Sequence, residues 1–180
     1  MSSKGKKSAH DRLLQAAEDL AWDTGAGNLT LDAVAARAGV SKGGLLYHFP
    51  SKQKLMEALV ENYIDRFSST LREREVENGQ GTNAGARAYL DLFVEETKCD
   101  RPPPSGVLAA LAENPSYLTP IRAHHREMLD RMKASAQDPT VALIVFLAIQ
   151  GIKSLDLLTM GTLSELEVAD AISRLEEMLS

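Results

Sequence analysis

The sequence has only one cysteine, Cys99, among its 180 residues, and aromatic residues make up just 5% of it. A single cysteine excludes an intrachain disulfide and a metal site built from several thiolates, and it fits a reducing compartment. No apolar stretch with a small-residue cleavage site follows the basic N-terminal residues, so no secretory signal peptide is expected. These absences predict a cytoplasmic protein.

Long apolar runs are also scarce. The run of consecutive apolar residues at 141–149 counts nine, whereas a membrane-spanning helix needs about 20. Gln150, Lys153 and Asp156 interrupt the apolar character that follows. We therefore expect a helix that is covered nearly all round within a protein, and no membrane partner.

Motifs of several enzyme classes are missing as well. The sequence contains no Gly-rich phosphate loop, HExxH helix, paired ExxH set or nucleophile elbow. His124 and His125 are adjacent, and neighbouring residues of a helix point about 100° apart, so the two imidazoles do not readily share one ion. Cys99 is interpreted as an inert thiol. We expect no cofactor, no metal site and no enzymatic activity, with a helical-bundle enzyme as an alternative.

The net charge of −5 is distributed unevenly along the chain. Residues 1–54 hold eight Lys or Arg against five Asp or Glu, a net charge of +3. The remainder holds twelve against twenty, a net charge of −8. A basic head on an acidic body indicates that only the N-terminal part meets a polyanion such as nucleic acid.

Apolar residues recur at helical spacing nearly throughout, and a strand pattern is almost absent. The spacing predicts an all-α protein of about nine helices. Ser164 and Glu167 form a predicted capping box for the last helix. Residues 78–85 are interpreted as a flexible loop by composition. The expected helices are 9–24, 30–38, a third from 41, 52–77, 84–98, a short one around Val107, Leu108 and Leu111, 120–136, 139–160 and 165–179.

Residues 30–49 read as two short helices joined by a tight turn. Thr30 and Ser41 are predicted N-caps, and Gly39 can close the first helix in the left-handed conformation. This spacing is typical of a helix-turn-helix.

Two glycines, Gly43 and Gly44, open the second of these helices, although glycine costs roughly 1 kcal/mol relative to alanine in a helix interior. A hydrophobic staple between Val40 and Leu45 is expected to hold the helix in place. At the second and third helical positions, bare backbone N–H groups can approach a phosphate or a base edge with no Cβ in the way. The glycines therefore indicate close contact with nucleic acid.

The run TLDAVAARAGVSKGGLLYHFPSKQKL at residues 30–55 resembles the DNA-binding domain of TetR-type transcriptional repressors nearly position for position. The resemblance covers about residues 10–60. It implies a homodimer with an all-helical body, released from double-stranded operator DNA when a small-molecule effector binds that body. The implied organisation is a flexible basic tail at 1–9, a helix-turn-helix domain at 10–54 and an effector-binding and dimerisation domain at 55–180.

Carried onto this chain, the resemblance implies two sets of DNA contacts. Lys42 stands at the start of its helix, where it is best placed to reach guanine O6 and N7. Leu46 departs from the family's frequent second aromatic residue, which leaves open whether it packs on a thymine methyl or on protein. Phosphates would be held by Thr30, Ser41, Tyr47, His48 and Lys52, and base edges would be faced by Lys42, Gly43 and Gly44.

Each of these features also has a purely structural interpretation. Tyr47 and His48 can be a packing residue and a solvent-facing imidazole, and the two glycines can mark only a loop. Lys52 and Lys54 can be solvated charges, although lysine is unfavourable in the first turn of a helix. A disordered solubilising tail and a minor-groove arm are the two interpretations of Lys4, Lys6 and Lys7.

The region after residue 55 is expected to hold an apolar effector pocket and a dimer interface. The pocket would lie between the helix at 52–77 and the helices of 84–136, although its candidate residues can also be simply core. The apolar helix at 139–160 needs more cover than one chain gives, so two helices from each subunit would form a four-helix interface. The candidate pocket residues are Phe67, Tyr89, Phe93, Leu108, Tyr117, His124 and Met128, and the candidate interface residues are Val145, Ile149, Ile152, Leu155, Ile172 and Leu175.

The predicted function is therefore a ligand-responsive transcriptional repressor. Besides the helical-bundle enzyme, the alternative is an architectural DNA-binding protein that has no effector. Binding of operator fragments and of apolar small molecules would separate the three.

Overall fold

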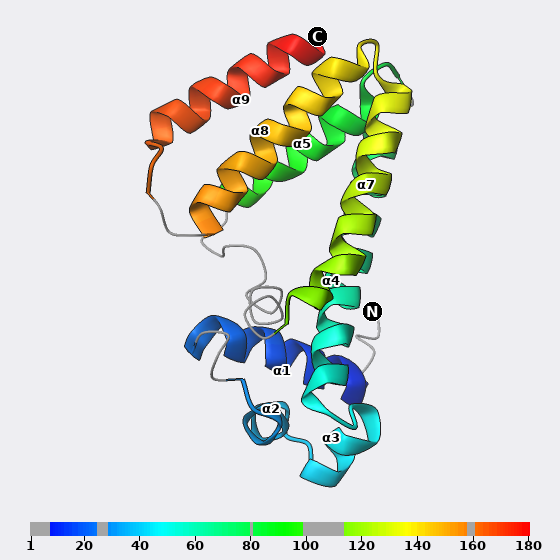
Figure 1. Cartoon of the computed structure of the whole chain (residues 1–180), viewed down its shortest axis with the longest axis vertical. Coiled ribbons are helices and arrows are strands. Elements are labelled where there is room, and N and C mark those ends of the chain that lie inside the picture. The colour runs from blue at the N-terminus through cyan, green and yellow to red at the C-terminus, as the bar shows by residue number, and fades with distance from the viewer. Residues whose placement is uncertain (1–7, 25–28, 80, 99–113, 158–160) are drawn as a thin grey trace, which may run out of the picture. The chain divides into compact units, whose positions relative to one another are not determined.

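The computed structural model describes residues 8–24, 29–79, 81–98, 114–157 and 161–180. These residues form eight α-helices, and none of them lies in a β-strand (Figure 1). The all-α class predicted from the sequence is confirmed. The described residues form eight α-helices, where about nine helices were expected. The helices are α1 (Ala9–Thr24), α2 (Leu31–Ala38), α3 (Lys42–His48), α4 (Lys52–Glu77), α5 (Ala84–Thr97), α7 (Leu118–Ser135), α8 (Pro139–Leu157) and α9 (Glu165–Leu179), and a short 3-10 helix, η2 (Pro115–Tyr117), precedes α7.

The observed helix bounds agree with the predicted ones to within a few residues. Helix α7 begins at Leu118, where residue 120 was expected, and α8 is described up to Leu157. The Ser164–Glu167 capping box at the start of α9 is confirmed, because each residue's side chain accepts from the other's backbone N–H. Several predicted features lie outside the described residues, namely Lys4, Lys6, Lys7, Cys99 and the short helix around Val107, Leu108 and Leu111.

The chain divides into two compact units. The first unit comprises Met1–Arg66 and Pro103–Arg122, and the second comprises Phe67–Pro102 and Ala123–Ser180. Helices α4 and α7 each contribute residues to both units. The division falls after Arg66 in α4 and after Arg122 in α7. The expected domain boundary at residue 54 lies near the start of the same helix.

Small apolar side chains of α1 and larger ones of α3 and α4 build the core of the first unit. Leu13, Ala17 and Ala21 recur every four residues and are buried on the face of α1 that packs against α2. Leu45 of α3 and Leu55 of α4 are completely buried in the same cluster. Full burial of one leucine stabilises a fold by about 1.5–3 kcal/mol. Helix α3, only seven residues long, is thus held by its apolar side.

In the second unit, α5, α8 and α9 pack against one another (Figure 1). Their shared core contains Tyr89 and Phe93 of α5, Val145 and Ile149 of α8 and Leu175 of α9, all of them buried. Interdigitation of such large side chains from three helices leaves each helix with one covered face.

Asn83 joins three helix ends of the second unit. It is buried, with a φ of 65°, and its backbone N–H donates to the carbonyl of Ser135 at 2.9 Å. Its side-chain amide donates to the carbonyl of Leu179 at 3.1 Å and accepts from the backbone N–H of Gln137 at 3.1 Å. Two positions further on, a Cβ at Gly85 would lie 3.3 Å from Met132 Cα, so α5 and α7 approach closely. The end of the stretch predicted as a flexible loop is therefore firmly held.

Candidate nucleic-acid interface and ligand site

Local hydrogen bonds set the turn between α2 and α3. Thr30 Oγ1 accepts from the backbone N–H of Ala33 at 3.2 Å and caps α2. Gly39 closes α2 in the left-handed conformation, with a φ of 63°. Ser41 Oγ accepts from the backbone N–H of Gly44 at 3.1 Å and caps α3. Both predicted N-caps and the predicted glycine closure are confirmed.

The two glycines of α3 have different surroundings. A Cβ built at Gly43 meets no atom within 4 Å, so its outer side is open. A Cβ at Gly44 would lie 2.9 Å from Val40 Cγ1 and 3.2 Å from Ser41 Oγ. Because the branched valine side chain has little freedom to move, the fold itself requires a glycine at position 44. Close approach to DNA therefore explains a glycine at position 43 better than at position 44.

Helix α3 presents Lys42 and Tyr47 to solvent. The Nζ atom of Lys42 lies 2.9 Å and 3.1 Å from the two carboxylate oxygens of Asp32 on α2, and both side chains are well exposed. Tyr47 is 84% exposed, the most of any large hydrophobic side chain in the described residues. Leu46 is 38% exposed, so its side chain is not part of the core. A basic group and an aromatic hydroxyl thus reach outward from one short helix.

His48, at the end of α3, is half-buried against α1. Its ring centroid lies 5.9 Å from that of His10, and His10 lies 5.0 Å from the ring of Phe49. Tyr47 meets His48 edge-on, with the two centroids 5.2 Å apart. These contacts fix the His48 imidazole close to the exposed Tyr47.

The start of α4 continues the same surface. Ser51 Oγ accepts from the backbone N–H of Lys54 at 3.2 Å, and Lys52 is half-buried. Lys54 Nζ lies 2.6 Å from Glu57 Oε2, and this hydrogen bond raises the pKa of Lys54. Both lysines stand in the first turn of α4, near the positive end of its dipole, where an approaching phosphate would be favoured.

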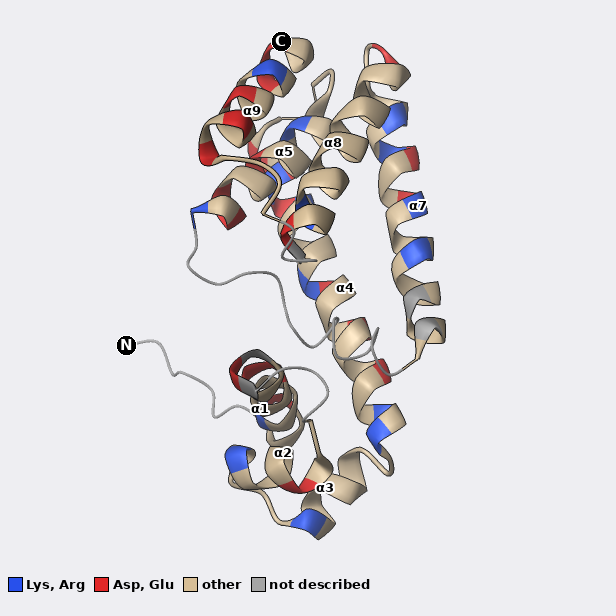
Figure 2. Ribbon diagram, turned by 60° about the vertical axis from the view of Figure 1, so that its left-hand side comes forward, with Lys and Arg blue, Asp and Glu red and all other residues tan. Residues whose placement is uncertain are grey.

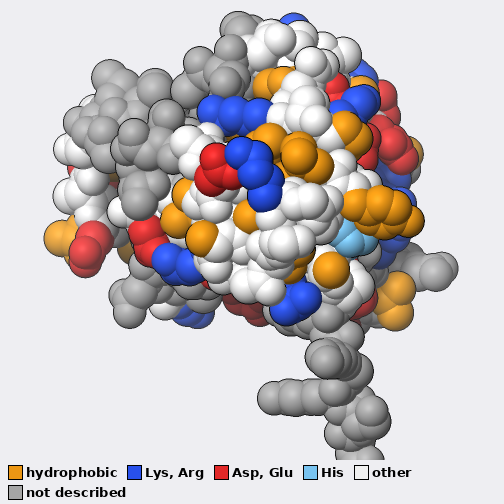
Figure 3. Space-filling model, turned by 90° about the horizontal axis from the view of Figure 1, so that it is seen from below, with side chains coloured by type: hydrophobic (Ala, Val, Ile, Leu, Met, Phe, Trp, Pro, Cys, Tyr) orange, Lys and Arg blue, Asp and Glu red, His pale blue; other side chains and the backbone are white. Residues whose placement is uncertain are grey.

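Charged side chains are mixed on this part of the chain. Lys and Arg residues are dispersed on α2, α3 and the start of α4, and acidic residues crowd α9 (Figure 2). On the face seen in Figure 3, the Lys and Arg side chains lie among hydrophobic and polar ones and do not merge into one patch. Arg37 pairs with Asp23 at 2.7 Å, as Lys42 pairs with Asp32. Arg37 and Lys42 are therefore each balanced by a neighbouring carboxylate.

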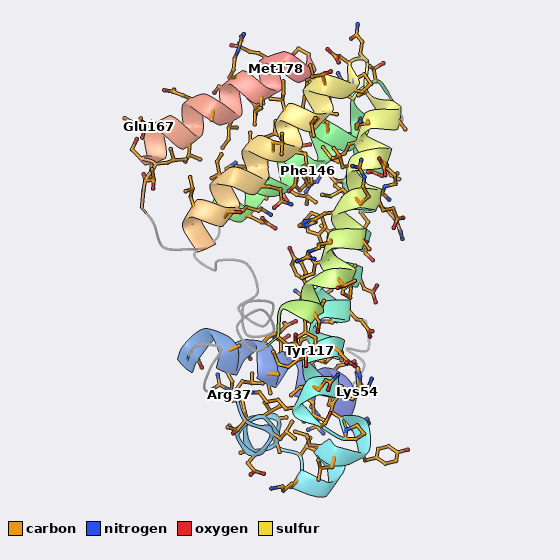
Figure 4. All side chains as sticks on the ribbon, viewed as in Figure 1. Arg37, Lys54, Tyr117, Phe146, Glu167 and Met178 are labelled. Carbon is orange, nitrogen blue, oxygen red and sulfur yellow. The ribbon has the colours of Figure 1, made fainter. Side chains whose placement is uncertain are left out.

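Aromatic rings gather in the second unit at the meeting of α4, α5, α7 and α8. Phe67 meets Tyr89 and His124 edge-on, at centroid distances of 6.1 Å and 5.8 Å. Phe146 stacks on Tyr89 at 6.1 Å and meets His125 edge-on at 5.9 Å. Figure 4 shows Phe146 among the side chains between α8 and α7. We call these five side chains the aromatic cluster.

One cation and one carboxylate border the aromatic cluster. Lys153 Nζ lies 5.6 Å from the ring centroid of Phe67 and 5.9 Å from that of Tyr89. The same atom lies 2.5 Å from Glu96 Oε2, in an ion pair whose geometry is not that of an aligned hydrogen bond. The Lys153 side chain is 19% exposed and that of Glu96 is 40% exposed. Both charges stand at the edge of an otherwise apolar site.

The two histidines of the cluster are held neutral. Burial, with smaller contributions from the neighbouring His124 and Lys153, lowers the pKa of His125 to about 4. Burial also lowers the pKa of His124. Gln150 Nε2 lies 3.2 Å from His125 Nε2, and Ser68 Oγ lies 3.4 Å from His124 Nδ1. The remaining ring nitrogen of His124, Nε2, is buried with no hydrogen-bond partner among the described residues.

The structure distributes the predicted pocket residues unequally. Phe67, Tyr89 and His124 belong to the aromatic cluster, and Phe93 and Met128 are buried in the core of the same unit. Tyr117 packs in the first unit, against the cluster formed by α1, α3 and α4, and Leu108 lies outside the described residues.

The sequence-based prediction of the ligand site did not include His125, Phe146, Gln150 and Lys153. For the last three, the sequence does hold a pattern that could have found them. Residues 146, 150 and 153 share one face of α8, and two of them are polar residues in a strongly apolar helix. Within the described residues, no group of three or more His, Cys, Asp or Glu side chains is placed to hold a metal ion.

The predicted dimer residues also separate into two groups. Val145, Ile149 and Leu175 are covered by their own chain, because α8 turns this face toward α5 and α9. They have almost no surface left to offer a second subunit. The other three, which are partly exposed, are Ile152, Leu155 and Ile172.

Helix α8 nevertheless leaves much apolar surface uncovered. By length and composition alone, the stretch Pro139–Asp156 would suffice to cross a membrane, and only 17% of it is buried inside the chain. Ile144 and Leu147 are 42% and 58% exposed, and the exposed Gly151 follows them on the same face. A Cβ at Gly151 would meet no atom within 4 Å. One side of α8 is thus apolar and exposed to solvent, and it carries no side chain at Gly151. We call it the open side of α8.

Two family models match the chain. The model of bacterial regulatory proteins of the tetR family covers residues 13–59, and that of the tetracyclin repressor-like C-terminal domain covers residues 83–180. The first match contains the whole of α2 and α3, and the second contains α5, α7, α8 and α9.

Several known proteins are similar to parts of the chain. The HTH-type transcriptional activator FasR of Mycolicibacterium smegmatis is 36% identical over 90 residues, which cover 48% of this chain and 41% of FasR. The nucleoid occlusion factor SlmA of Aliivibrio fischeri is 42% identical over 95 residues, 52% of this chain and 48% of SlmA. The chain thus matches less than half the length of either relative.

Among solved structures, the multidrug binding protein EbrR complexed with malachite green superposes with a TM-score of 0.70. The superposition covers 97% of this chain and 99% of EbrR at 23% sequence identity. At this level of identity the likeness concerns the fold.

Proposed function

The chain belongs to the TetR family of bacterial regulatory proteins, and from this premise we propose that it is a dimeric, sequence-specific repressor that a small, mainly apolar ligand releases from its operator. Members of this family are DNA-binding transcriptional regulators rather than enzymes. The observation that carries the proposal is the capped turn from α2 to α3, which holds Lys42 and Tyr47 outward on a short, firmly anchored helix. A regulator of this kind works in the cytoplasm, where the DNA is.

On the DNA, we assign base reading to the start of α3 and positioning to its end and to the start of α4. Lys42 has the reach for guanine O6 and N7, and the open side of Gly43 lets the backbone come close to a base edge. Gly44, the next residue of α3, would lie beside Gly43 at the same base edge. Phosphates would be held by Thr30, Ser41, Tyr47, His48 and Lys52. Phosphate contacts fix register and supply salt-dependent affinity, while base contacts supply specificity.

The aromatic cluster is the proposed ligand site. It combines large rings with neutral histidines and one ion pair, the mixture of apolar surface and few polar groups that small-molecule sites use. The structural neighbour EbrR, called a multidrug binding protein in complex with malachite green, supports a ligand of this general kind. Helix α4 contributes residues to both units, which makes it the proposed link between ligand and DNA.

A dimer would cover the open side of α8. The proposed interface consists of Ile144, Leu147 and Gly151 of α8, with Ile152, Leu155 and Ile172 at its margin. The absence of a side chain at Gly151 allows two helices to approach closely. Twofold symmetry would then match two operator half-sites.

Selection of bound fragments from genomic DNA, followed by fluorescence titration, tests this proposal. We expect the chain to enrich one palindromic sequence and to bind it at least about a thousandfold more tightly than a scrambled duplex. A panel of apolar ligands should contain members that raise the melting temperature of the chain and weaken operator binding. Equal affinity for operator and scrambled duplex would rule out sequence-specific regulation.

The similarity to SlmA favours one second candidate, an architectural DNA-binding protein without an effector. In that case the chain would bind DNA, but no ligand of the panel would change its affinity. The same titration, run with and without each ligand, separates the two functions.

A further inference from the structure

Lys153 occupies a position inside the second unit that suits a different kind of cation. Its ammonium lies over the faces of Phe67 and Tyr89, at 5.6 Å and 5.9 Å from their centroids, and beside the Glu96 carboxylate at 2.5 Å. The side chain starts from α8, the most apolar of the described helices, and about four fifths of its surface is covered, since it is 19% exposed.

A lysine ammonium loses more hydration at such a position than a cation with apolar substituents would. The ammonium is compact, strongly hydrated and carries three N–H donors. Here the ammonium has exchanged water for two ring faces and one carboxylate. A cation whose charge is surrounded by methyl or other apolar groups loses less hydration on entering and gains the same attraction to the rings.

The surroundings also favour a ligand with apolar groups. Phe146 stacks on Tyr89 and extends the ring surface, and His125 meets Phe146 edge-on. His124 and His125 carry no charge near neutral pH, because burial lowers the pKa of each, so neither repels a cation. His124 Nε2 is a buried polar atom with no partner among the described residues, and a polar substituent of a ligand can satisfy it.

We propose that the ligand of this chain is an organic cation with apolar substituents, which displaces the Lys153 ammonium from Phe67 and Tyr89 and pairs with Glu96. This inference rests on the proposed function, in which a ligand of the aromatic cluster controls DNA binding. Lys153 acts as the internal occupant of the site in the ligand-free chain. Once displaced, its flexible stem carries the ammonium into water, where its hydration is restored.

An anionic ligand fits the same residues less well. It would have to take Lys153 away from Glu96 and would leave that carboxylate beside a second negative charge. A cationic ligand keeps the carboxylate paired throughout. The charge of Glu96 thus selects the sign of the ligand.

Three probes test the charge of the ligand on the full chain by NMR titration. Choline and 3,3-dimethylbutan-1-ol have the same shape and differ only in the charge of the branched centre. The third probe, 3,3-dimethylbutanoate, keeps the branched apolar end and carries a negative charge at its other end. We expect choline to bind about fivefold to tenfold more tightly than the neutral alcohol, and the anion to bind weakest. If the alcohol or the anion binds as tightly as choline, the proposal is wrong.

Two variants and one matched control test the roles of the residues. Glu96→Gln should weaken choline binding about tenfold, whereas Lys153→Met should strengthen it about fivefold by removing the internal competitor. Glu95→Gln, which alters the neighbouring residue that pairs with Arg74 outside the cluster, should leave choline affinity unchanged. Weaker choline binding by a folded Lys153→Met variant would overturn the displacement.

The side chain of Lys153 supplies a readout that does not depend on any variant. Ring currents of Phe67 and Tyr89 should shift its ε-methylene protons upfield in the free chain, and choline should return them to the position of a solvated lysine. Unchanged proton shifts at saturating choline would contradict the displacement. If choline binds and moves these protons but operator affinity stays the same, the site is real and the proposed ligand-controlled function is what fails.

Discussion

At the scale of single residues, the side of α3 that is proposed to meet DNA already holds an ion pair, between Lys42 and Asp32. Lys42 is held by Asp32, yet both side chains are more than half exposed. Exposed pairs of this kind contribute about 0–1 kcal/mol, so a DNA base can take over Lys42 at little cost. Asp32 thus orients the Lys42 ammonium in the structure.

The first prediction separates base reading from positioning. Lys42→Ala should cost roughly 1–3 kcal/mol per half-site on the operator and much less on a scrambled duplex, because only the operator offers a bidentate guanine contact. Lys52→Ala should weaken binding to both duplexes equally and flatten the salt dependence by about one charge per subunit. Fluorescence titrations at several salt concentrations measure both effects. Equal losses on both duplexes for Lys42→Ala would contradict the assignment.

The second prediction uses the two glycines as a matched pair. Gly44→Ala should destabilise the chain by about 1–2 kcal/mol, since its Cβ would clash with Val40 Cγ1 at 2.9 Å. Gly43→Ala should be neutral or slightly stabilising, because its Cβ meets open space and alanine favours a helix. Urea denaturation measures the stability of each variant. Operator affinity should fall for Gly43→Ala despite its intact fold, and unchanged affinity would remove the close-approach explanation.

At the scale of helices, the second unit depends on side chains that tie helix ends together. Asn83 bonds to the ends of α7 and α9, and the Arg87 guanidinium reaches the same Leu179 carbonyl. Helix ends leave backbone groups unpaired, and burial makes each unpaired group costly. One buried amide therefore supports the packing of three helices.

The third prediction concerns this junction. Asn83→Ala should lower the free energy of unfolding by about 2–4 kcal/mol, because it removes one buried and one partly buried hydrogen bond and places alanine at a φ of 65°. Asn83→Gly should cost about 1 kcal/mol less, since glycine adopts that φ freely. Asn78→Ala serves as the control, because Asn78 bonds only at the surface, to Asp91. Thermal and urea unfolding compare the three variants, and an equal loss for Asn78→Ala and Asn83→Ala would contradict the role of burial.

The fourth prediction concerns the contact between α7 and α8 at His125 and its dependence on pH. The folded pKa of about 4 lies below the usual 6.5, so the unfolded chain binds the proton more readily. Stability should be complete above about pH 6.5 and should fall by about 2–3 kcal/mol as the pH drops from there to about 4. His124 adds a loss in the same direction, because its pKa is also lowered.

Urea denaturation across this pH range measures the loss. His125→Gln, which keeps a polar group for Gln150, should make the pH dependence clearly shallower. A slope that His125→Gln leaves unchanged would assign the titration to other groups.

At the scale of the whole molecule, two compact units share α4 and α7, and one side of α8 stays open. A ligand shifts an equilibrium only by its differential affinity for the two states. The proposed ligand therefore has to bind the DNA-incompetent arrangement more tightly, and residues of α4 in both units are the proposed route of coupling. The open side of α8 is where a second subunit would pack.

The fifth prediction tests that packing with three substitutions to glutamate. Leu147→Glu should give a folded monomer, because Leu147 is 58% exposed on α8. Ile149→Glu should unfold the chain, because Ile149 is completely buried within it. That variant therefore cannot report on the interface. Val76→Glu, at a 72% exposed position on α4, is the control and should keep the mass of a dimer. Light scattering at micromolar concentration decides, and a Leu147→Glu variant with unchanged mass would exclude this interface.

Much of the fold was determined by the sequence alone. The caps at Thr30, Ser41 and Ser164 and the closure at Gly39 depend on residues within a few positions of one another. Such hydrogen bonds require only local dihedral angles and neighbours, which is why their residue types predict them. The apolar spacing predicted the helices for the same reason, and the α2–α3 motif predicted the DNA-binding family.

Only the tertiary structure decided which helix faces meet. An apolar side chain looks the same in the sequence whether its own chain or a second chain covers it, so Val145 and Ile149 could not be distinguished from Leu147. The same applies to contacts between distant residues. The hydrogen bond from the Asn83 side chain to the Leu179 carbonyl spans 96 positions, and no local sequence pattern predicts it. Lys153 likewise reaches Glu96 and Tyr89 only because α8 packs on α5, and it reaches Phe67 only because that ring of α4 lies beside Tyr89. Packing of that kind depends on the whole arrangement of helices rather than on any one of them.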